Sequence, residues 1–223
     1  MDERRGDRAF TLIELLVVTG IMVVVSGIIL ASNSQYGGKV LLQNFAYDLA
    51  LSIRQAQVYG ISVQRFGSGE SANFSNGYGM HFDLTSASNA TSYLIFADAI
   101  TVNGLYDGVV GCPQSTGSGT EFVQCSSIGR GYAISKLCAP AGADATLCTE
   151  VNRLDILFKR PEPDACISAN SISNVTIVNG VQQCAPIYSS ARIVVRSPRG
   201  DTMSISVQAN GQIAVDQKPS VSP

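Results

Sequence analysis

Residues 10–30, FTLIELLVVTGIMVVVSGIIL, decide the fold of this chain. They form an apolar run of 21 residues with a single charge, Glu14. A helix of this length spans about 30 Å, the thickness of the hydrocarbon core of a bilayer. Valine and isoleucine are weak helix formers in water. In lipid, however, the backbone must satisfy its own hydrogen bonds, and a helix does so within one segment. The run therefore predicts a membrane-spanning helix over 10–31.

Two simpler interpretations explain this run less well. A cleaved secretory signal peptide has an apolar core of about 7–15 residues and a small-residue cleavage site. Here the run is longer, and the sequence 31–34 after it, ASNS, is a weak cleavage motif. A plain signal anchor explains the length but not Glu14, because a carboxylate inside an apolar helix costs on the order of 2–3 kcal/mol. We therefore treat Glu14 as a functional residue.

The segment MDERRGDRA-FTLIELLVVTGIMVVV resembles the leader and the cleavage and methylation motif of type IV prepilins. The resemblance implies a leader over 1–9, cleavage by prepilin peptidase between Ala9 and Phe10, and methylation of the new amine at Phe10. It also implies that Glu14 faces the N-terminal amine of a neighbouring subunit, which offsets the penalty of an isolated buried charge.

Two features of the leader depart from that family's pattern. Ala9 stands where glycine is usual, and three acidic residues cancel the three arginines. Lysine and arginine count for more than acids in setting membrane orientation. We therefore expect a single-pass protein of the inner membrane, with the leader in the cytoplasm and the C-terminal domain outside.

The helical pattern continues beyond the apolar run. Apolar residues recur at spacings of 3, 4, 4 and 3, which is the period of one helix face. They are Leu42, Phe45, Leu49, Ile53 and Ala56. We expect an amphipathic continuation of the helix over 32–60, with a bend or a melted turn at Gly37-Gly38, or two separate helices, as the open alternatives.

The remainder, 61–223, reads as strands and turns. Alternating or β-branched runs predict strands at 77–84, 92–98, 153–159, 191–197, 203–208 and 212–215. Asn210-Gly211 between the last two is a strong hairpin signal. Segments 64–77 and 111–150 are rich in Gly, Ser and Thr and are predicted as loops, the second within an insertion over 111–190. The fold class is α+β: a long N-terminal transmembrane α-helix packed on an antiparallel β-sheet domain.

This arrangement is similar to the GspH/FimT class of minor pseudopilins and pilins. The resemblance rests on segments 49–63, 92–108 and 194–215 and does not extend to the insertion. It implies a structural minor subunit of a type IV pilus or type II secretion filament and no enzymatic activity. The implied partners are other pilin or pseudopilin subunits, prepilin peptidase and the inner-membrane assembly platform.

Six cysteines lie in the C-terminal half, with no C-x-x-C pair. An even number at wide spacing favours disulfides in an oxidising compartment over a zinc site, which also lacks histidines. Six cysteines allow 15 pairings, and the sequence does not choose among them. The least demanding pairing joins neighbours: Cys112 with Cys125, Cys138 with Cys148, and Cys166 with Cys184.

Other candidate chemistry is sparse, and no cofactor is expected. His81 alternates with apolar residues and is predicted to face solvent on a strand. The loop with Asp98, Asn103 and Asp107 is a weak calcium candidate, because it lacks the alternating ligands of an EF-hand and a turn at Asn103 explains it.

The alternative function is a DNA-binding minor pilin for natural transformation. Arg192 and Arg196 share one strand face, and Arg199 follows close by. The chain has a net charge of −2, only 14% charged residues and one lysine in its last eight residues. Nucleic acid is therefore an unlikely partner.

Overall fold

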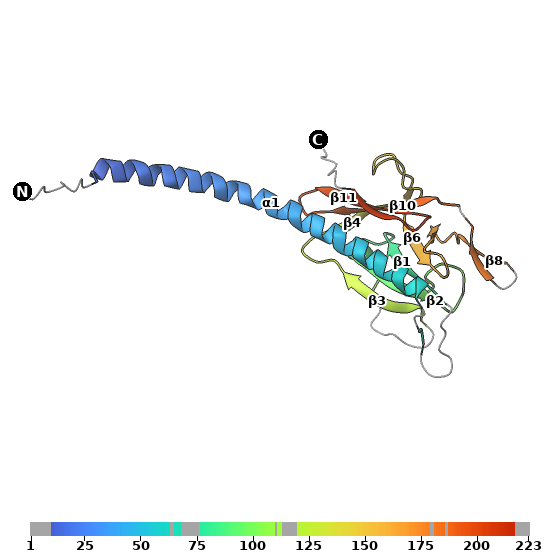
Figure 1. The fold of residues 1–223 in the computed structure, drawn as a ribbon. Helices are drawn as coiled ribbons and strands as arrows, with labels where there is room; N and C mark the ends of the chain where they lie inside the picture. The colour runs from blue at the N-terminus through green and yellow to red at the C-terminus, as the bar shows by residue number, and fades with distance from the viewer. Residues whose placement is uncertain are drawn as a thin grey trace, which may run out of the picture. The chain divides into compact units, whose positions relative to one another are not determined.

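The computed structural model describes residues 10–62, 65–67, 76–109, 111–112, 120–178, 181–185 and 187–216. The chain divides into two compact units, Met1–Val40 and Leu41–Pro223. The leader and Ala9 lie outside the described residues. The expected α+β class is confirmed: an apolar N-terminal helix is joined to a domain of antiparallel strands (Figure 1).

Helix α1 runs without interruption from Leu12 to Ile61, and its backbone is helical through Gly37-Gly38. The two alternatives at the glycine pair, a melted turn and two separate helices, are therefore wrong. Val and Ile at this density are compatible with a helix because their environment, not their intrinsic propensity, decides the conformation.

The part of α1 within the second unit packs one face into the main core. Leu42, Ala46, Leu49, Ile53 and Ala56 are each at most 2% exposed. The spacing of 4, 3, 4 and 3 places them along one side of the helix. The predicted stripe is thus confirmed, with Phe45 packed at its margin.

Twelve strands and one short 3-10 helix, η2 (Asn89–Thr91), complete the described part of the second unit. The first sheet has the order β3-β2-β1-β6-β7 and the second the order β12-β11-β10-β4-β5, with a separate hairpin β8–β9 (Figure 1). All pairings are antiparallel. The bounds are β1 Gly77–Asp83, β2 Ser92–Asp98, β3 Phe122–Ser127, β4 Ala133–Cys138, β5 Glu150–Val151, β6 Arg153–Phe158, β7 Ala165–Ala169, β8 Val175–Val178, β9 Val181–Cys184, β10 Ser190–Arg196, β11 Thr202–Gln208 and β12 Ile213–Asp216.

One hydrophobic core joins α1 to both sheets. Met80 and Phe82 of β1, Ile193 of β10 and Ile205 of β11 lie in the same buried cluster as the helix stripe. The opposite face of the first sheet carries a second, smaller cluster that includes Phe96 and Tyr106. Both faces of β1 are therefore buried, as its uninterrupted burial pattern shows.

The loop predicted over 111–150 needs correction. This segment contains β3 and β4, each of six residues, and the start of β5. β3 is an edge strand of the first sheet, and β4 lies between β10 and β5 in the second. The 111–190 segment therefore supplies strands to both sheets.

Candidate functional site

The first turn of α1 carries the charged group singled out by the sequence. Thr11 precedes the helix, and its hydroxyl Oγ1 accepts a hydrogen bond from the Glu14 backbone N–H at 3.3 Å. The same hydroxyl lies 3.5 Å from Glu14 Oε2, to which it donates. This is the Thr-x-x-Glu arrangement of a helix start, and the helix dipole favours a negative charge there. Glu14 is thus held at the helix N-terminus next to the predicted cleavage position.

The apolar segment that follows exposes its side chains. Residues Leu12–Leu30 have a mean hydropathy of 2.6 and none of them is buried, and among the described residues only this helix is long and apolar enough to cross a membrane. Its one hydroxyl-bearing residue near the start, Thr19, donates to the carbonyls of Leu15 and Leu16, both at 3.0 Å. Phe10, directly before the helix, is 78% exposed. The only charge on this surface is Glu14, so the segment can bury itself in an apolar medium and offer one carboxylate to a cation there.

The three disulfides join neighbouring cysteines, the least demanding of the possible pairings, and no cysteine in the described residues is free. Cys112–Cys125 ties the end of the 99–112 segment to β3, and Cys138–Cys148 closes the loop after β4. Cys166–Cys184 joins β7 to β9. Each bridge therefore restrains a segment that has few other features to hold it in one conformation.

The calcium candidates lie in one loop, but their oxygens bind the loop itself. Asp98 is fully buried, and its two carboxylate oxygens accept the N–H groups of Asn103 at 3.1 Å and Gly104 at 3.0 Å. The Asn103 amide donates to Asp107 at 3.0 Å. Among the described residues no group of three His, Cys, Asp or Glu side chains could hold a metal. This hydrogen bonding fits a turn rather than a cation site.

Two further carboxylates organise the same loop, and the sequence analysis missed both. Glu121, only 1% exposed, accepts the N–H groups of Ala99, Ile100 and Asp107 at 3.0 to 3.2 Å. Burial raises the pKa of Glu121 although these hydrogen bonds oppose the shift. The other carboxylate is that of Asp155 on β6, whose Oδ1 accepts a hydrogen bond from the Tyr106 N–H at 3.3 Å. No spacing in the sequence connects these acids to the loop.

His81 is buried, so the prediction that it faces solvent is wrong. It is 4% exposed, and its Nδ1 lies 2.7 Å from Oδ1 of Asp155 on the neighbouring strand β6. Its ring lies against that of Tyr106 from the 99–109 loop, with 5.0 Å between centroids. That loop covers the face of β1 that the alternation pattern assigned to water. His81 therefore links the loop to the sheet and is enclosed by both.

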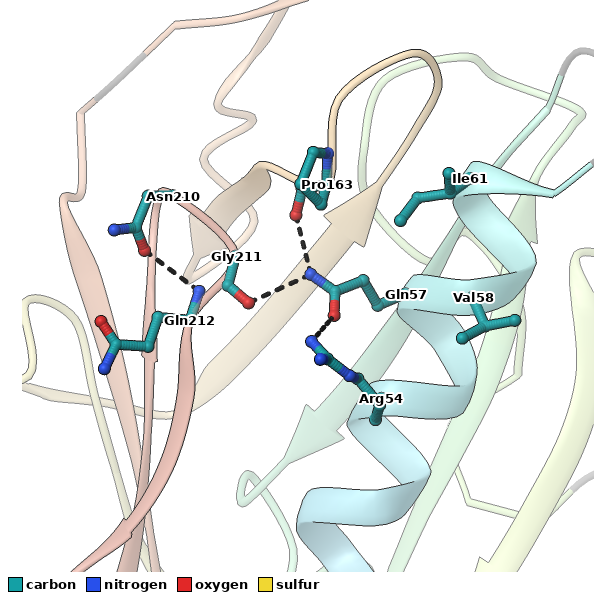
Figure 2. A pocket seen from close by; sticks show the side chains of 8 residues that line it. All are labelled: Arg54, Gln57, Val58, Ile61, Pro163, Asn210, Gly211 and Gln212. Atoms are coloured by element: carbon teal, nitrogen blue, oxygen red, sulfur yellow. Dashed lines mark hydrogen bonds between the residues drawn. The ribbon is translucent and has the colours of Figure 1, made fainter.

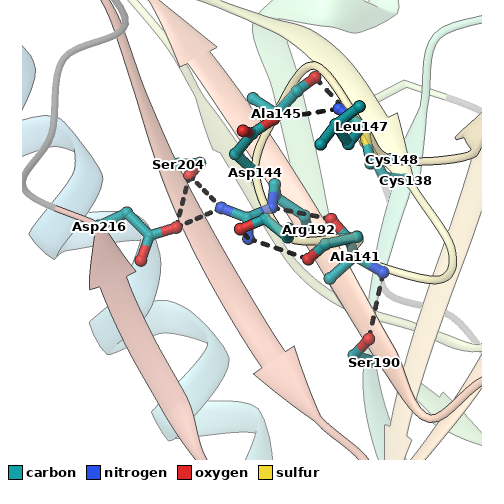
Figure 3. Close-up of polar contacts among 12 residues, drawn as sticks. Cys138, Ala141, Asp144, Ala145, Leu147, Cys148, Ser190, Arg192, Ser204 and Asp216 are labelled. Carbon is teal, nitrogen blue, oxygen red and sulfur yellow. Dashed lines mark hydrogen bonds and ion pairs between the residues drawn. A yellow bond between two sulfur atoms is a disulfide. The ribbon is translucent and has the colours of Figure 1, made fainter.

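Arg192 also lies inside the protein (Figure 3). It is 6% exposed and ion-paired with Asp216 of β12. Its Nε donates to the Ala141 carbonyl at 3.0 Å, and its Nη1 donates to the Ser204 hydroxyl at 2.7 Å. The same guanidinium thus connects β12 to the loop closed by Cys138–Cys148.

Arg192 and Arg196, predicted on one strand face, therefore differ in their exposure to solvent. Arg196 is exposed at the end of β10, whereas Arg192 cannot reach a phosphate. The prediction that both share a face is geometrically right, but the face is covered at Arg192 by the 139–148 loop. The DNA-binding alternative loses one of its three arginines.

A groove of about 480 Å³ lies between the C-terminal part of α1 and the β11–β12 turn (Figure 2). Gln57, 2% exposed, stands at its centre. Its Nε2 donates to the carbonyls of Pro163 at 2.9 Å and Gly211 at 3.0 Å. Its Oε1 accepts a hydrogen bond from Arg54 at 2.5 Å. The hydrogen bonds of Gln57 in this groove therefore fix the predicted Asn210-Gly211 turn to the helix.

Comparison with protein families matches residues 4–30 to the family described as Prokaryotic N-terminal methylation motif. The match covers most of the predicted leader, the predicted cleavage position, Glu14 and the whole apolar run. Neither the curated proteins nor the solved structures gave a match. The chain thus carries a type IV prepilin-like N-terminal motif on an apolar helix, which fits a membrane-anchored pilin or pseudopilin precursor.

Proposed function

We propose that this chain is a minor structural subunit of a type IV pilus or type II secretion filament, of the GspH/FimT class, and that it acts by assembly. Prepilin peptidase cuts between Ala9 and Phe10 and methylates the new amine. The apolar helix then leaves the inner membrane through the assembly platform and enters the core of the filament, where it contacts other pilin or pseudopilin subunits. The C-terminal domain stays outside the membrane throughout.

One observation carries the proposal: the methylation motif at 4–30 coincides with a helix that exposes an apolar surface whose only charge is Glu14. An apolar surface of this size is stable only in lipid or against similar helices. A membrane anchor alone has no use for the carboxylate, which costs on the order of 2–3 kcal/mol in such a segment. Assembly gives it a use.

The geometry of the first turn gives Glu14 a defined place in that assembly. The Thr11 hydroxyl and the helix dipole keep the carboxylate at the N-terminal end of α1. There it can accept the N-terminal amine of Phe10 from a neighbouring subunit. Each charge then has a partner inside an apolar core, and a helix inserted in another register would leave both unpaired.

The described part of the globular domain supports a structural role. Its buried histidine is engaged by Asp155, and its buried carboxylates accept backbone N–H groups. These contacts hold the 99–109 loop against the first sheet. The antiparallel sheets behind the amphipathic part of α1 fit the pilin-like class that the sequence indicated.

The experiment that tests this proposal determines the N-terminus of the mature chain. Intact mass and N-terminal sequencing are compared between cells with and without prepilin peptidase. We expect a chain that begins with methylated Phe10 only when the peptidase is present, and Ala9→Leu should block the cut because the enzyme needs a small residue there. A mature chain that begins after Leu30 would identify an ordinary signal peptide and overturn the proposal.

A further inference from the structure

One of the two nitrogens of the His81 ring has a partner and the other has none. Nδ1 lies 2.7 Å from Oδ1 of Asp155, and the same oxygen accepts the Tyr106 N–H at 3.3 Å. Oδ1 is therefore the acceptor and Nδ1 the donor, so Nε2 of the neutral ring carries a lone pair. Nε2 is buried, and no described residue forms a hydrogen bond with it. A buried polar atom without a partner is rare in folded proteins and indicates a bound molecule.

A small cavity lies next to His81, on the face of the first sheet that carries the smaller buried cluster. Its lining includes Asp83 of β1, Asn89 of η2, and Ser92 and Leu94 of β2. β1 lies between β6 and β2, and His81 pairs with Asp155 on one side and with Leu94 on the other. Because Nδ1 faces Asp155 on β6, the opposite edge of the ring faces β2 and the cavity. The lone pair of Nε2 thus belongs to the cavity wall.

The polar side chains of the lining direct their hydrogen bonds to groups other than His81. Asp83 accepts the Asn89 amide at 3.3 Å and the Arg153 Nε at 2.8 Å. The Ser92 hydroxyl donates to the Asn89 carbonyl at 3.4 Å, a long and therefore weak contact. Ser92 shares a sheet face with Leu94 and hence with His81, because residues two apart on a strand point the same way. The lining therefore offers further polar groups to a molecule that donates to Nε2.

We propose that one water molecule is bound in this cavity as a fixed part of the domain and donates a hydrogen bond to His81 Nε2. Its remaining hydrogen bonds go to the polar groups of Asn89 and Ser92. Buried waters in proteins typically make about three hydrogen bonds to groups that otherwise lack partners. The Ser92 hydroxyl, held only by its long contact, can turn to this water.

The size of the cavity selects water over larger or charged ligands. About 10 Å³ is open to the centre of a water molecule, and one bound water needs roughly 10–15 Å³ by this measure. A phosphate, a sugar or a peptide side chain does not fit this space. A metal ion is disfavoured as well, because within the described ranges no three His, Cys, Asp or Glu side chains form a ligand set.

The bound water fixes the chemistry of His81. It favours the tautomer with the proton on Nδ1, which is the form that pairs with Asp155. It also extends the polar contacts of this covered face from β6 through β1 to Ser92 on β2. The inference concerns the globular domain alone and does not depend on the proposed function.

The test uses the full-length chain in detergent micelles and NMR spectra of its histidine. His81 is the only histidine in the sequence, so isotope-labelled histidine reports on this ring alone. At a pH where titration shows the ring to be neutral, we expect a proton on Nδ1 and none on Nε2. Magnetisation transferred from water should reach the ring protons next to Nε2 with the sign typical of a long-lived bound water. A proton on Nε2 of the neutral ring, or no transfer from water, would overturn the inference.

A matched pair of variants then locates the water. Ser92→Val replaces the hydroxyl with an apolar side chain that occupies the cavity, so the signal from water should disappear. Ser126→Val makes the same change on the edge strand β3, outside the cavity lining, and should keep the signal. Valine suits both positions because each lies in a strand, and urea unfolding checks that both variants fold. A signal that survives Ser92→Val, or that is lost equally in both variants, would refute the proposed water site.

Discussion

Replacing Gly211 with alanine perturbs the contact that fixes the β11–β12 turn to α1. Gly211 has a φ of +79°, and an added Cβ would lie 2.1 Å from the Pro163 carbonyl oxygen and 2.7 Å from Gln57 Nε2. The Pro163 oxygen belongs to the backbone and cannot move alone, so the turn must shift. The shift separates Gln57 from both of its carbonyl acceptors.

The expected loss of stability has two parts. A non-glycine residue at positive φ costs about 1–2 kcal/mol. Each buried hydrogen bond that the shift breaks costs about 1–3 kcal/mol, because a polar group is left unsatisfied. With both hydrogen bonds broken, these give a loss of roughly 3–8 kcal/mol. Gly200→Ala is the matched control, since Gly200 has a φ of +94° and an added Cβ there would meet nothing within 4 Å, so only about 1–2 kcal/mol applies.

Urea unfolding of the full chain in detergent micelles, followed by tyrosine fluorescence, measures both variants. We expect Gly211→Ala to lose at least about 2 kcal/mol more than Gly200→Ala. Equal losses for the two variants would refute the argument that the Gln57 contact fixes the turn, since backbone strain would then account for both.

Three further changes test other parts of the molecule. Burial alone would raise the pKa of Asp83, but hydrogen bonds from Thr85, Arg153 and Asn89 lower it overall. Asp83→Asn should therefore cost stability at pH 7, and this cost should shrink progressively as the pH falls below about 3.9. Urea unfolding at several pH values measures the effect. Arg192→Ala should cost about 1–3 kcal/mol by removing the donors to the Ala141 carbonyl and the Ser204 hydroxyl, against less than about 0.5 for exposed Arg196→Ala, in the same unfolding assay. Thiol labelling of the denatured, unreduced protein should find all six cysteines oxidised, and labelling of all six would contradict the disulfides.

The helix and some of the strands could be predicted from the sequence because their apolar residues recur at a regular local spacing. The stripe from Leu42 to Ala56 and the alternating run of β1 are local patterns, so they survive without knowledge of the tertiary structure. Asn210-Gly211 likewise marks the turn that the structure shows. The sequence Val175–Val178 followed by Asn179-Gly180 carries the same signal, and we missed it because the surrounding segment was interpreted as an insertion.

The failures have a common cause, which is burial decided by distant segments. His81 alternates with apolar residues as a half-exposed strand would, but the 99–109 loop covers that face and Asp155 engages its ring. β4 forms a strand because it pairs with β10, which lies much later in the chain. The Ser- and Gly-rich sequence around β4 gives no sign of that partner and therefore suggested a loop. Arg192 looked like a surface charge because Asp216, its partner, lies on a strand two positions away in the sheet.

The candidate site could be proposed from the sequence alone because its chemistry is local. Phe10, Thr11 and Glu14 lie within five residues of one another at the start of α1, and the apolar run behind them needs no tertiary contact to be recognised. The buried carboxylates around the 99–107 loop are the opposite case. Asp155 reaches the loop from β6 and Glu121 from the segment before β3, and only the folded chain brings them together.

The most direct test of the assembly mechanism compares Glu14→Val with Thr11→Val. The first removes the carboxylate, whereas the second removes only the hydroxyl that caps the helix, at a cost of about 1 kcal/mol, and keeps the charge. Both proteins should reach the membrane in wild-type amounts, since each change makes the segment more apolar. The measurement is the amount of each protein in sheared, purified filaments relative to the amount in membranes. An unpaired buried amine costs about 3–5 kcal/mol, so Glu14→Val should enter filaments roughly a hundredfold or more less often, and Thr11→Val close to the wild-type level. Incorporation of Glu14→Val at the wild-type level, or an equal loss in both variants, would contradict the pairing of Glu14 with a neighbouring Phe10 amine.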